Sequence, residues 1–178
     1  PKGGRTVMRW RASTRIRSGL VVALTLSIPV VISALPAGAA TQITTGSGTY
    51  RAGAPTGTLG VQPGVGDGNP GTCTDIGNFA HEINPGSGGW FSSADRTVWS
   101  GSTYVHVYAN TGSSFSWDSN AAIDLVMVKA GDAYDIFSYG SGATGDTGLH
   151  GPEKWNTGGS KWQTLGISHA LFCWNDPV

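Results

Sequence analysis

Short runs in which apolar and polar residues alternate, separated by turn residues, recur through the second half of the chain. The segment 104–108 (YVHVY) alternates valine with tyrosine and histidine, and 115–117 (FSW) is a shorter piece of the same kind. This period of two is typical of β-strands with one buried face. Another strand is expected at 98–99 (VW), and no strong helical period occurs after residue 40. The pattern therefore predicts an all-β protein.

One apolar run predicts a more deeply buried strand. The segment 123–129 (IDLVMVK) is apolar almost throughout, which indicates a strand that is buried on both faces. Turn residues at 130–132 (AGD) join it to a strand at 134–139 (YDIFSY), as in a hairpin. A closing strand is expected within 167–174 (ISHALFCW).

Two segments rich in glycine, serine and threonine, 140–148 and 151–166, are expected to be loops. The second of them carries Trp155 and Trp162. Strands separated by turns in this way favour an antiparallel β-sandwich of the immunoglobulin-like or jelly-roll-like kind.

The N-terminal residues have the order of a secretory signal peptide. Arginines cluster within 9–17, an apolar segment follows at 19–35, and small residues at Ala37 and Ala39 form an A-x-A site. The apolar segment is short for a membrane-spanning helix, which disfavours a retained anchor. We therefore expect a leader helix that is cleaved near Ala39–Ala40, export by the general secretory route, and an extracellular location.

These features divide the chain into three parts. Residues 1–40 are the expected signal peptide, of which 1–7 are interpreted as an overshoot upstream of Met8. Residues 41–71 are rich in Gly, Thr and Pro, and the sequence leaves open whether they are partly flexible or form short edge strands. Residues 72–178 are expected to form the β-sandwich domain.

The two parts of the chain differ in charge. Six of the eleven Lys and Arg residues precede residue 40, whereas all eleven Asp and Glu residues follow it. The exported part thus carries five basic and eleven acidic groups, a net charge of −6. Acidic proteins repel phosphate backbones, so nucleic acid is excluded as a partner. Without a basic patch, binding to an anionic membrane surface is not expected after cleavage of the leader.

Cys73 and Cys173 are the two cysteines of the chain, and both lie in the expected exported part. An even count of cysteines in an oxidising compartment predicts a disulfide. A redox site would need a C-x-x-C motif and a metal site would need further ligands at metal spacing. The predicted bridge closes a loop of about 100 residues, worth roughly 4–5 kcal/mol in the chain-entropy model.

Four motifs in fixed order resemble a β-domain of secreted and wall-anchored bacterial proteins. The motifs are 115–117 (FSW), 123–130 (IDLVMVKA), 146–152 (DTGLHGP) and 167–173 (ISHALFC). The pattern of that family is approximately F-x-W, V-K-G-G, D-T-G-L-H-x-P and S-H-x-x-F-C, and the resemblance covers Cys73 to Trp174. Ala130 stands where the family has glycine. The resemblance implies an extracellular structural module, and it does not imply a known catalytic activity.

Three polar residues of these motifs invite a sharper interpretation. Asp146, His150 and His169 are candidates for a divalent-ion site, since the motifs provide an acid and two imidazoles. The alternative, which we favour, is structural. Asp146 then bonds the backbone of its own turn, as Asp commonly does, and the two histidines join the loop at 151–152 to the last strand. No metal and no cofactor are therefore predicted.

Six tryptophans follow residue 40, which is many for a domain of this size. Exposed aromatic rings stack on sugar rings and anchor protein interfaces. Trp155, Trp162 and Trp90 are the candidates for such binding. Trp99 is expected in the core, as are the tryptophans at 117 and 174.

Three functions remain. The first is a secreted or cell-surface domain without catalysis, which has a structural or adhesive role and a cell-wall or extracellular glycan or protein as partner. The second is a carbohydrate-binding module that uses the candidate tryptophans. The third is a small extracellular hydrolase, although the sequence marks no carboxylate pair. A triad of Ser168, His169 and Asp124 is disfavoured because neighbours in a strand point to opposite faces. We predict that the protein is not an enzyme.

Overall fold

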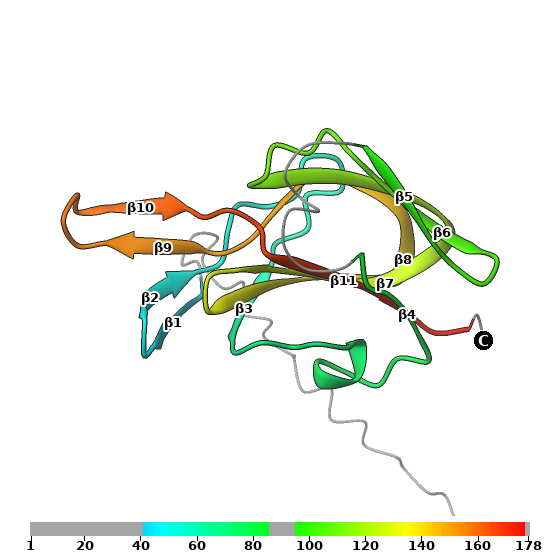
Figure 1. Cartoon of the computed structure of the whole chain (residues 1–178), viewed down its shortest axis with the longest axis horizontal. Helices are drawn as coiled ribbons and strands as arrows, with labels where there is room; N and C mark the ends of the chain where they lie inside the picture. Colours follow the sequence, from blue (N-terminus) through cyan, green and yellow to red (C-terminus); the bar gives the residue numbers. More distant parts are fainter. Residues whose placement is uncertain (1–40, 86–94, 177–178) are drawn as a thin grey trace, which may run out of the picture. The chain divides into compact units, whose positions relative to one another are not determined.

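The computed structural model describes residues 41–85 and 95–176, so the expected leader lies outside it. The described chain is all-β, as the alternating pattern predicts, and its strands pair in antiparallel sheets. Figure 1 shows the elements, which in chain order are β1 (Gln42–Thr45), β2 (Gly48–Arg51), β3 (Gly64–Asp67), the 3-10 helix η1 (Cys73–Asp75), β4 (His81–Ile83), β5 (Arg96–Ser100), β6 (Thr103–Tyr108), β7 (Ser114–Ala130), β8 (Ala133–His150), β9 (Glu153–Asn156), β10 (Lys161–Thr164) and β11 (His169–Trp174). Among the described residues there is no helix with the length and apolar character to cross a membrane.

A hairpin of two long strands organises the fold. β7 has 17 residues and β8 has 18, and the pairing between them shifts register in the region of Asp118 to Ile123. The first part of β7 pairs with β6, whereas its last part pairs with β11. Gly131 forms the turn between β7 and β8 with φ +64°, which glycine adopts readily. The predicted hairpin at this turn is confirmed, although its strands are much longer than expected.

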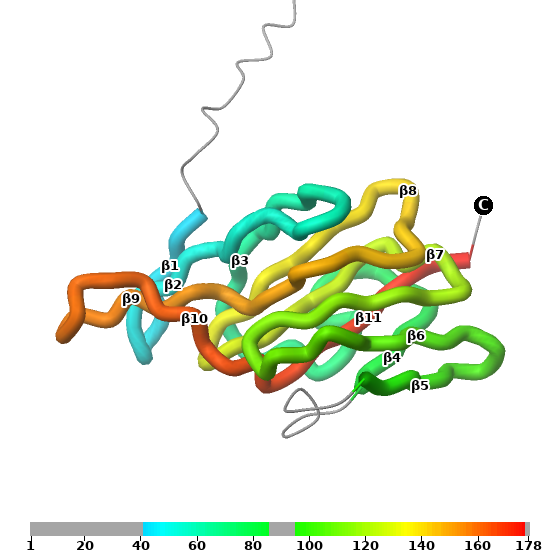
Figure 2. The backbone as a smooth tube through the Cα atoms, turned by 90° about the horizontal axis from the view of Figure 1, so that it is seen from above, coloured from blue at the N-terminus to red at the C-terminus, as the bar shows by residue number. Residues whose placement is uncertain are grey.

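The strands form two sheets. The larger has the order β3-β8-β7-β11-β4, with β6 added to β7 and β5 added to β6. The smaller has the order β1-β2-β9-β10. Figure 2 shows β9 and β10 beside β1 and β2, at one end of the larger sheet. Residues 41–71 therefore contain the short strands β1, β2 and β3, which is one of the two alternatives that the sequence left open.

The prediction that both glycine-rich segments are loops was wrong. Residues 140–148 belong to β8, and 151–166 contain the β9–β10 hairpin. The turn of this hairpin is closed by the Asn156 side chain, whose Oδ1 accepts hydrogen bonds from the backbone N–H of Gly158 and Gly159 at 3.0 and 3.2 Å. Its strands have no fully buried face, so the alternation that indicates a strand is absent.

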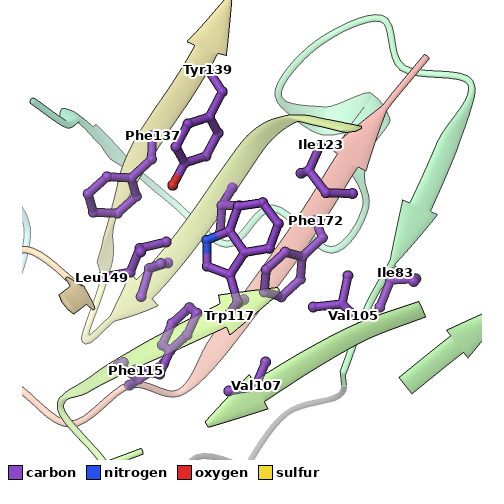
Figure 3. Close-up of a cluster of buried hydrophobic side chains, with 14 of the residues drawn as sticks. Ile83, Val105, Val107, Phe115, Trp117, Ile123, Phe137, Tyr139, Leu149 and Phe172 are labelled. Carbon is purple, nitrogen blue, oxygen red and sulfur yellow. The ribbon is translucent and has the colours of Figure 1, made fainter. Parts of the chain in front are cut away.

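The main core collects side chains from both parts of the long hairpin. Figure 3 shows Trp117 in its middle, surrounded by labelled residues from several strands. Its fully buried members include Val105, Val107, Phe115, Trp117, Ile123, Val126, Val128, Phe137, Leu149, Ala170 and Phe172. Trp117 packs edge-on against Phe172 and Tyr139, with ring centroids 5.5 and 5.7 Å apart. Such edge-to-face contacts add to the stabilisation that burial of the rings provides.

A second apolar cluster covers the opposite face of the last part of β7. Leu125 and Met127 on β7 and Leu171 on β11 pack there against the segment that contains η1. Cys73 and Cys173 join this segment to β11, with their Cα atoms 5.7 Å apart. The pairing of the two cysteines is thus as predicted. Since the last part of β7 is covered on both sides, its sequence at 123–129 is apolar almost throughout.

Candidate functional site

β5 and β6 present aromatic side chains on the face that points away from the core, and the first part of β7 adds Asp118 beside them. Along β6, Val105 and Val107 are buried, so the intervening residues point outward. The strand register places Trp99 opposite Tyr104, and His106 between Thr97 and Asp118. We call this surface the aromatic face, and its members are Thr97, Trp99, Tyr104, His106, Tyr108 and Asp118.

The rings of the aromatic face form two pairs, one across β5 and β6 and the other along β6. Trp99 is 62% exposed, and its ring centroid lies 5.2 Å from that of Tyr104, at an interplanar angle of 55°. His106 and Tyr108 are nearly parallel, with centroids 5.3 Å apart. A shallow depression of about 320 Å³ lies between Trp99, Tyr104, His106 and their polar neighbours. The result is an aromatic surface on which Trp99 is exposed and the rings of Tyr104, His106 and Tyr108 are half-buried.

Polar groups are fixed among these rings. His106 Nδ1 lies 3.0 Å from Asp118 Oδ2, which orients the imidazole. The backbone N–H of Tyr104 donates to Asn120 Oδ1 at 2.8 Å, and the Ser119 hydroxyl donates to the Tyr104 carbonyl at 2.6 Å. These bonds hold β6 against β7 where β7 begins to change partners. The face therefore combines apolar ring surfaces with hydrogen-bonding groups in fixed positions.

The position of Trp99 corrects the expectation that it belongs to the core. β5 pairs with β6 alone among the described strands, and Val98, not Trp99, packs against the core. The pairing with Tyr104 puts Trp99 on the outer face. The alternation at 104–108 gave the outward direction of Tyr104, His106 and Tyr108, but the two-residue pattern at 98–99 did not fix its own register.

Trp155 and Trp162 lie directly opposite each other in the β9–β10 hairpin. Their ring centroids are 5.2 Å apart in an edge-to-face arrangement, and both side chains are half-buried. The guanidinium carbon of Arg51 lies 4.6 Å from the centroid of Trp162, so Arg51 covers part of that ring. Trp90, the third candidate, lies outside the described residues.

Asp146 is buried, and its carboxylate accepts hydrogen bonds both from the adjacent backbone and from residues distant in sequence. Its Oδ1 accepts hydrogen bonds from the backbone N–H of Thr147, Leu59 and Thr58 at 2.8, 3.1 and 3.3 Å. Its Oδ2 accepts one from the Tyr139 hydroxyl at 3.2 Å. Asp146 thereby attaches the loop that precedes β3 to β8.

His150 and His169 lie at the ends of two strands. His150 Nδ1 is 3.1 Å from the carbonyl oxygen of Gly151, and its ring meets Phe137 edge-on. His169 begins β11, opposite Lys129. Within 41–85 and 95–176, no three His, Cys, Asp or Glu side chains gather in a way that could hold a metal ion.

No family model, no curated protein and no solved structure matches this chain. The resemblance to the family of secreted β-domains thus stays a prediction.

Proposed function

We propose that this chain is an exported, non-catalytic β-sandwich domain that binds neutral carbohydrate through the aromatic face and acts in adhesion. The core supports the sandwich, because it is filled from both parts of the long hairpin, which pair with different strands. The order of charged, apolar and small residues in 1–40 supports export.

The observation that carries the binding proposal is the exposure of Trp99 beside Tyr104 and His106. The faces of aromatic rings carry partial negative charge, which suits the C–H groups on the flat side of a sugar ring. The hydroxyls at the edge of the sugar need hydrogen-bond partners, and Asp118, His106 and Thr97 offer acceptors and donors beside the rings. A sugar therefore meets both kinds of surface at once.

The charge of the site favours a neutral sugar. Asp118 places a carboxylate on the aromatic face, and the exported part has a net charge of −6. Both disfavour an anionic ligand. Glycoside hydrolysis generally requires two apposed carboxyl groups, and among its described members the aromatic face has one. This composition fits binding without turnover.

The test is a glycan array, followed by affinity electrophoresis of the purified protein in gels that contain neutral polysaccharides. Trp99→Ala should weaken binding about thirtyfold, since truncating an anchor of this kind costs about 2 kcal/mol. Leu59→Ala is the matched control, because Leu59 is 50% exposed and lies outside the aromatic face. Absence of binding to every neutral glycan, or equal losses in both variants, would contradict the proposal.

A further inference from the structure

The basic residues of the exported part are unevenly distributed. Three of the five, Arg51, Lys154 and Lys161, lie on the small sheet β1-β2-β9-β10, which has a single acid, Glu153. The rest of the exported part has two basic and ten acidic residues. The small sheet is thus a positive region of an acidic protein.

Arg51 and Lys154 of the small sheet make different contacts. Arg51 pairs with Glu153, to which its Nε donates at 2.6 Å, and it also covers Trp162. Lys154 forms no ion pair within the described residues, and its Nζ lies 5.6 Å from the ring centroid of Tyr50. Its stem crosses Gly48, where a Cβ atom would come within 2.9 Å of Cε. Lys154 therefore has a defined position and a charge that no described carboxylate neutralises.

Lys154 lies in a groove of about 600 Å³ at the end of the small sheet. The other residues that line it are Ser47, Gly48, Thr49, Trp155, Asn156, Thr157, Gln163 and Leu165. Hydroxyls and carboxamides can donate and accept hydrogen bonds, as sugar hydroxyls require. Trp155, the neighbour of Lys154 on β9, also lines the groove. The groove thus surrounds one ammonium group with polar side chains that can exchange hydrogen bonds with sugar hydroxyls.

From this combination we infer that the groove is a second binding site, which takes an anionic saccharide whose acidic group pairs with Lys154. The acidic group is a carboxylate or a sulfate, both of which an ammonium binds with charge-assisted hydrogen bonds. The site shares no residue with the aromatic face and does not depend on the function proposed for that face. A domain with both sites would hold a neutral and an anionic glycan together.

The experiment is titration calorimetry of the purified protein with a galacturonate oligosaccharide, which is acidic only through carboxylates, and an oligosaccharide of a sulfated galactan, which is acidic only through sulfates, at low and at 0.15 M salt. Lys154→Gln should weaken binding of at least one of them about tenfold, the loss of one charged hydrogen bond. Lys154→Arg should retain most of the affinity. Arg96→Gln removes the same charge from β5, outside the groove, and should leave the affinity unchanged.

The two oligosaccharides distinguish a carboxylate site from a sulfate site. Poly-glutamate is included to separate a saccharide site from an unspecific anion site, and it should bind much more weakly. The inference is overturned if neither oligosaccharide binds at low salt, if Lys154→Gln and Arg96→Gln lose affinity equally, or if poly-glutamate binds as tightly as the saccharides. Trp99→Ala should not change this binding, so the failure of one site is distinguishable from the failure of the other.

Discussion

Asp135 on β8 is an acid in the interior of the protein. Its side chain is fully buried, and its Oδ2 accepts a hydrogen bond from the backbone N–H of Gly53 at 3.0 Å. Its Oδ1 has no hydrogen-bond partner among the described residues. Burial raises the pKa of Asp135 from its ordinary 3.8 to about 8, and the negative charge of Glu153 adds to the rise, while the Gly53 bond opposes it. At neutral pH the carboxyl group is therefore protonated.

The raised pKa of Asp135 predicts that the protein loses stability as the pH rises. Between 3.8 and about 8 the folded chain keeps a proton that the unfolded chain releases. The free energy of unfolding then falls with pH in this window, at most by about 1.4 kcal/mol per unit. Asp135→Asn keeps an acceptor for Gly53 and removes the titration, so urea unfolding at pH 4 to 8 should show a flatter profile and a gain at pH 8.

Asp67→Asn is the control for this experiment, because Asp67 is exposed at the end of β3. That variant should keep the slope of the unaltered protein. A slope that is equally steep in Asp135→Asn would show that other groups cause it.

At the level of elements, the glycines of β8 explain why a strand was mistaken for a loop. Gly145 pairs with Asp118, and a Cβ atom there would lie 2.9 Å from the carbonyl oxygen of Trp117. A glycine in a strand often marks such a close approach of two backbones. Composition alone does not distinguish this use of glycine from its use in flexible loops.

Gly145→Ala should therefore destabilise the protein by about 1–3 kcal/mol, because the added methyl group overpacks the contact between β8 and β7. Gly64→Ala on β3 is the matched substitution in another strand, where a Cβ atom would have nothing within 4 Å. It should be neutral or slightly stabilising, since alanine restricts the unfolded chain. Chemical denaturation of both variants gives the comparison. Equal effects would show that close approach is not the reason for glycine at 145.

The sequence could predict those elements whose side chains carry a local signal. The outward side of β6 followed from the alternation at 104–108, and the burial of the last part of β7 on both faces followed from the apolar run at 123–129. The orientation of Trp99 and the β9–β10 hairpin depend instead on the register of strand pairing, which no clear alternation of buried and exposed residues marks in these short strands. Tyr104, His106 and Tyr108 could thus be placed together from the sequence, whereas the position of Trp99 beside them required the register.

For the molecule as a whole, the disulfide and the main core act on different sides of the larger sheet. The disulfide belongs to the cluster in which the η1 segment covers Leu125, Met127 and Leu171. Trp117 and the other residues behind the aromatic face belong to the main core. A change that loosens the η1 segment should therefore leave the aromatic face intact.

Replacing Cys73 and Cys173 by alanine together should lower the free energy of unfolding by about 2–5 kcal/mol, since the open chain gains conformational entropy when it unfolds. Urea unfolding followed by tryptophan fluorescence measures this change, with the unaltered protein in reductant as the parallel sample. Because Val105, Val107 and Trp117 keep their packing, the folded variant should bind neutral glycan with the affinity of the unaltered protein. A variant that stays folded but loses this binding would show that the disulfide also shapes the aromatic face, and an unchanged unfolding midpoint would show that the η1 segment holds its place without it.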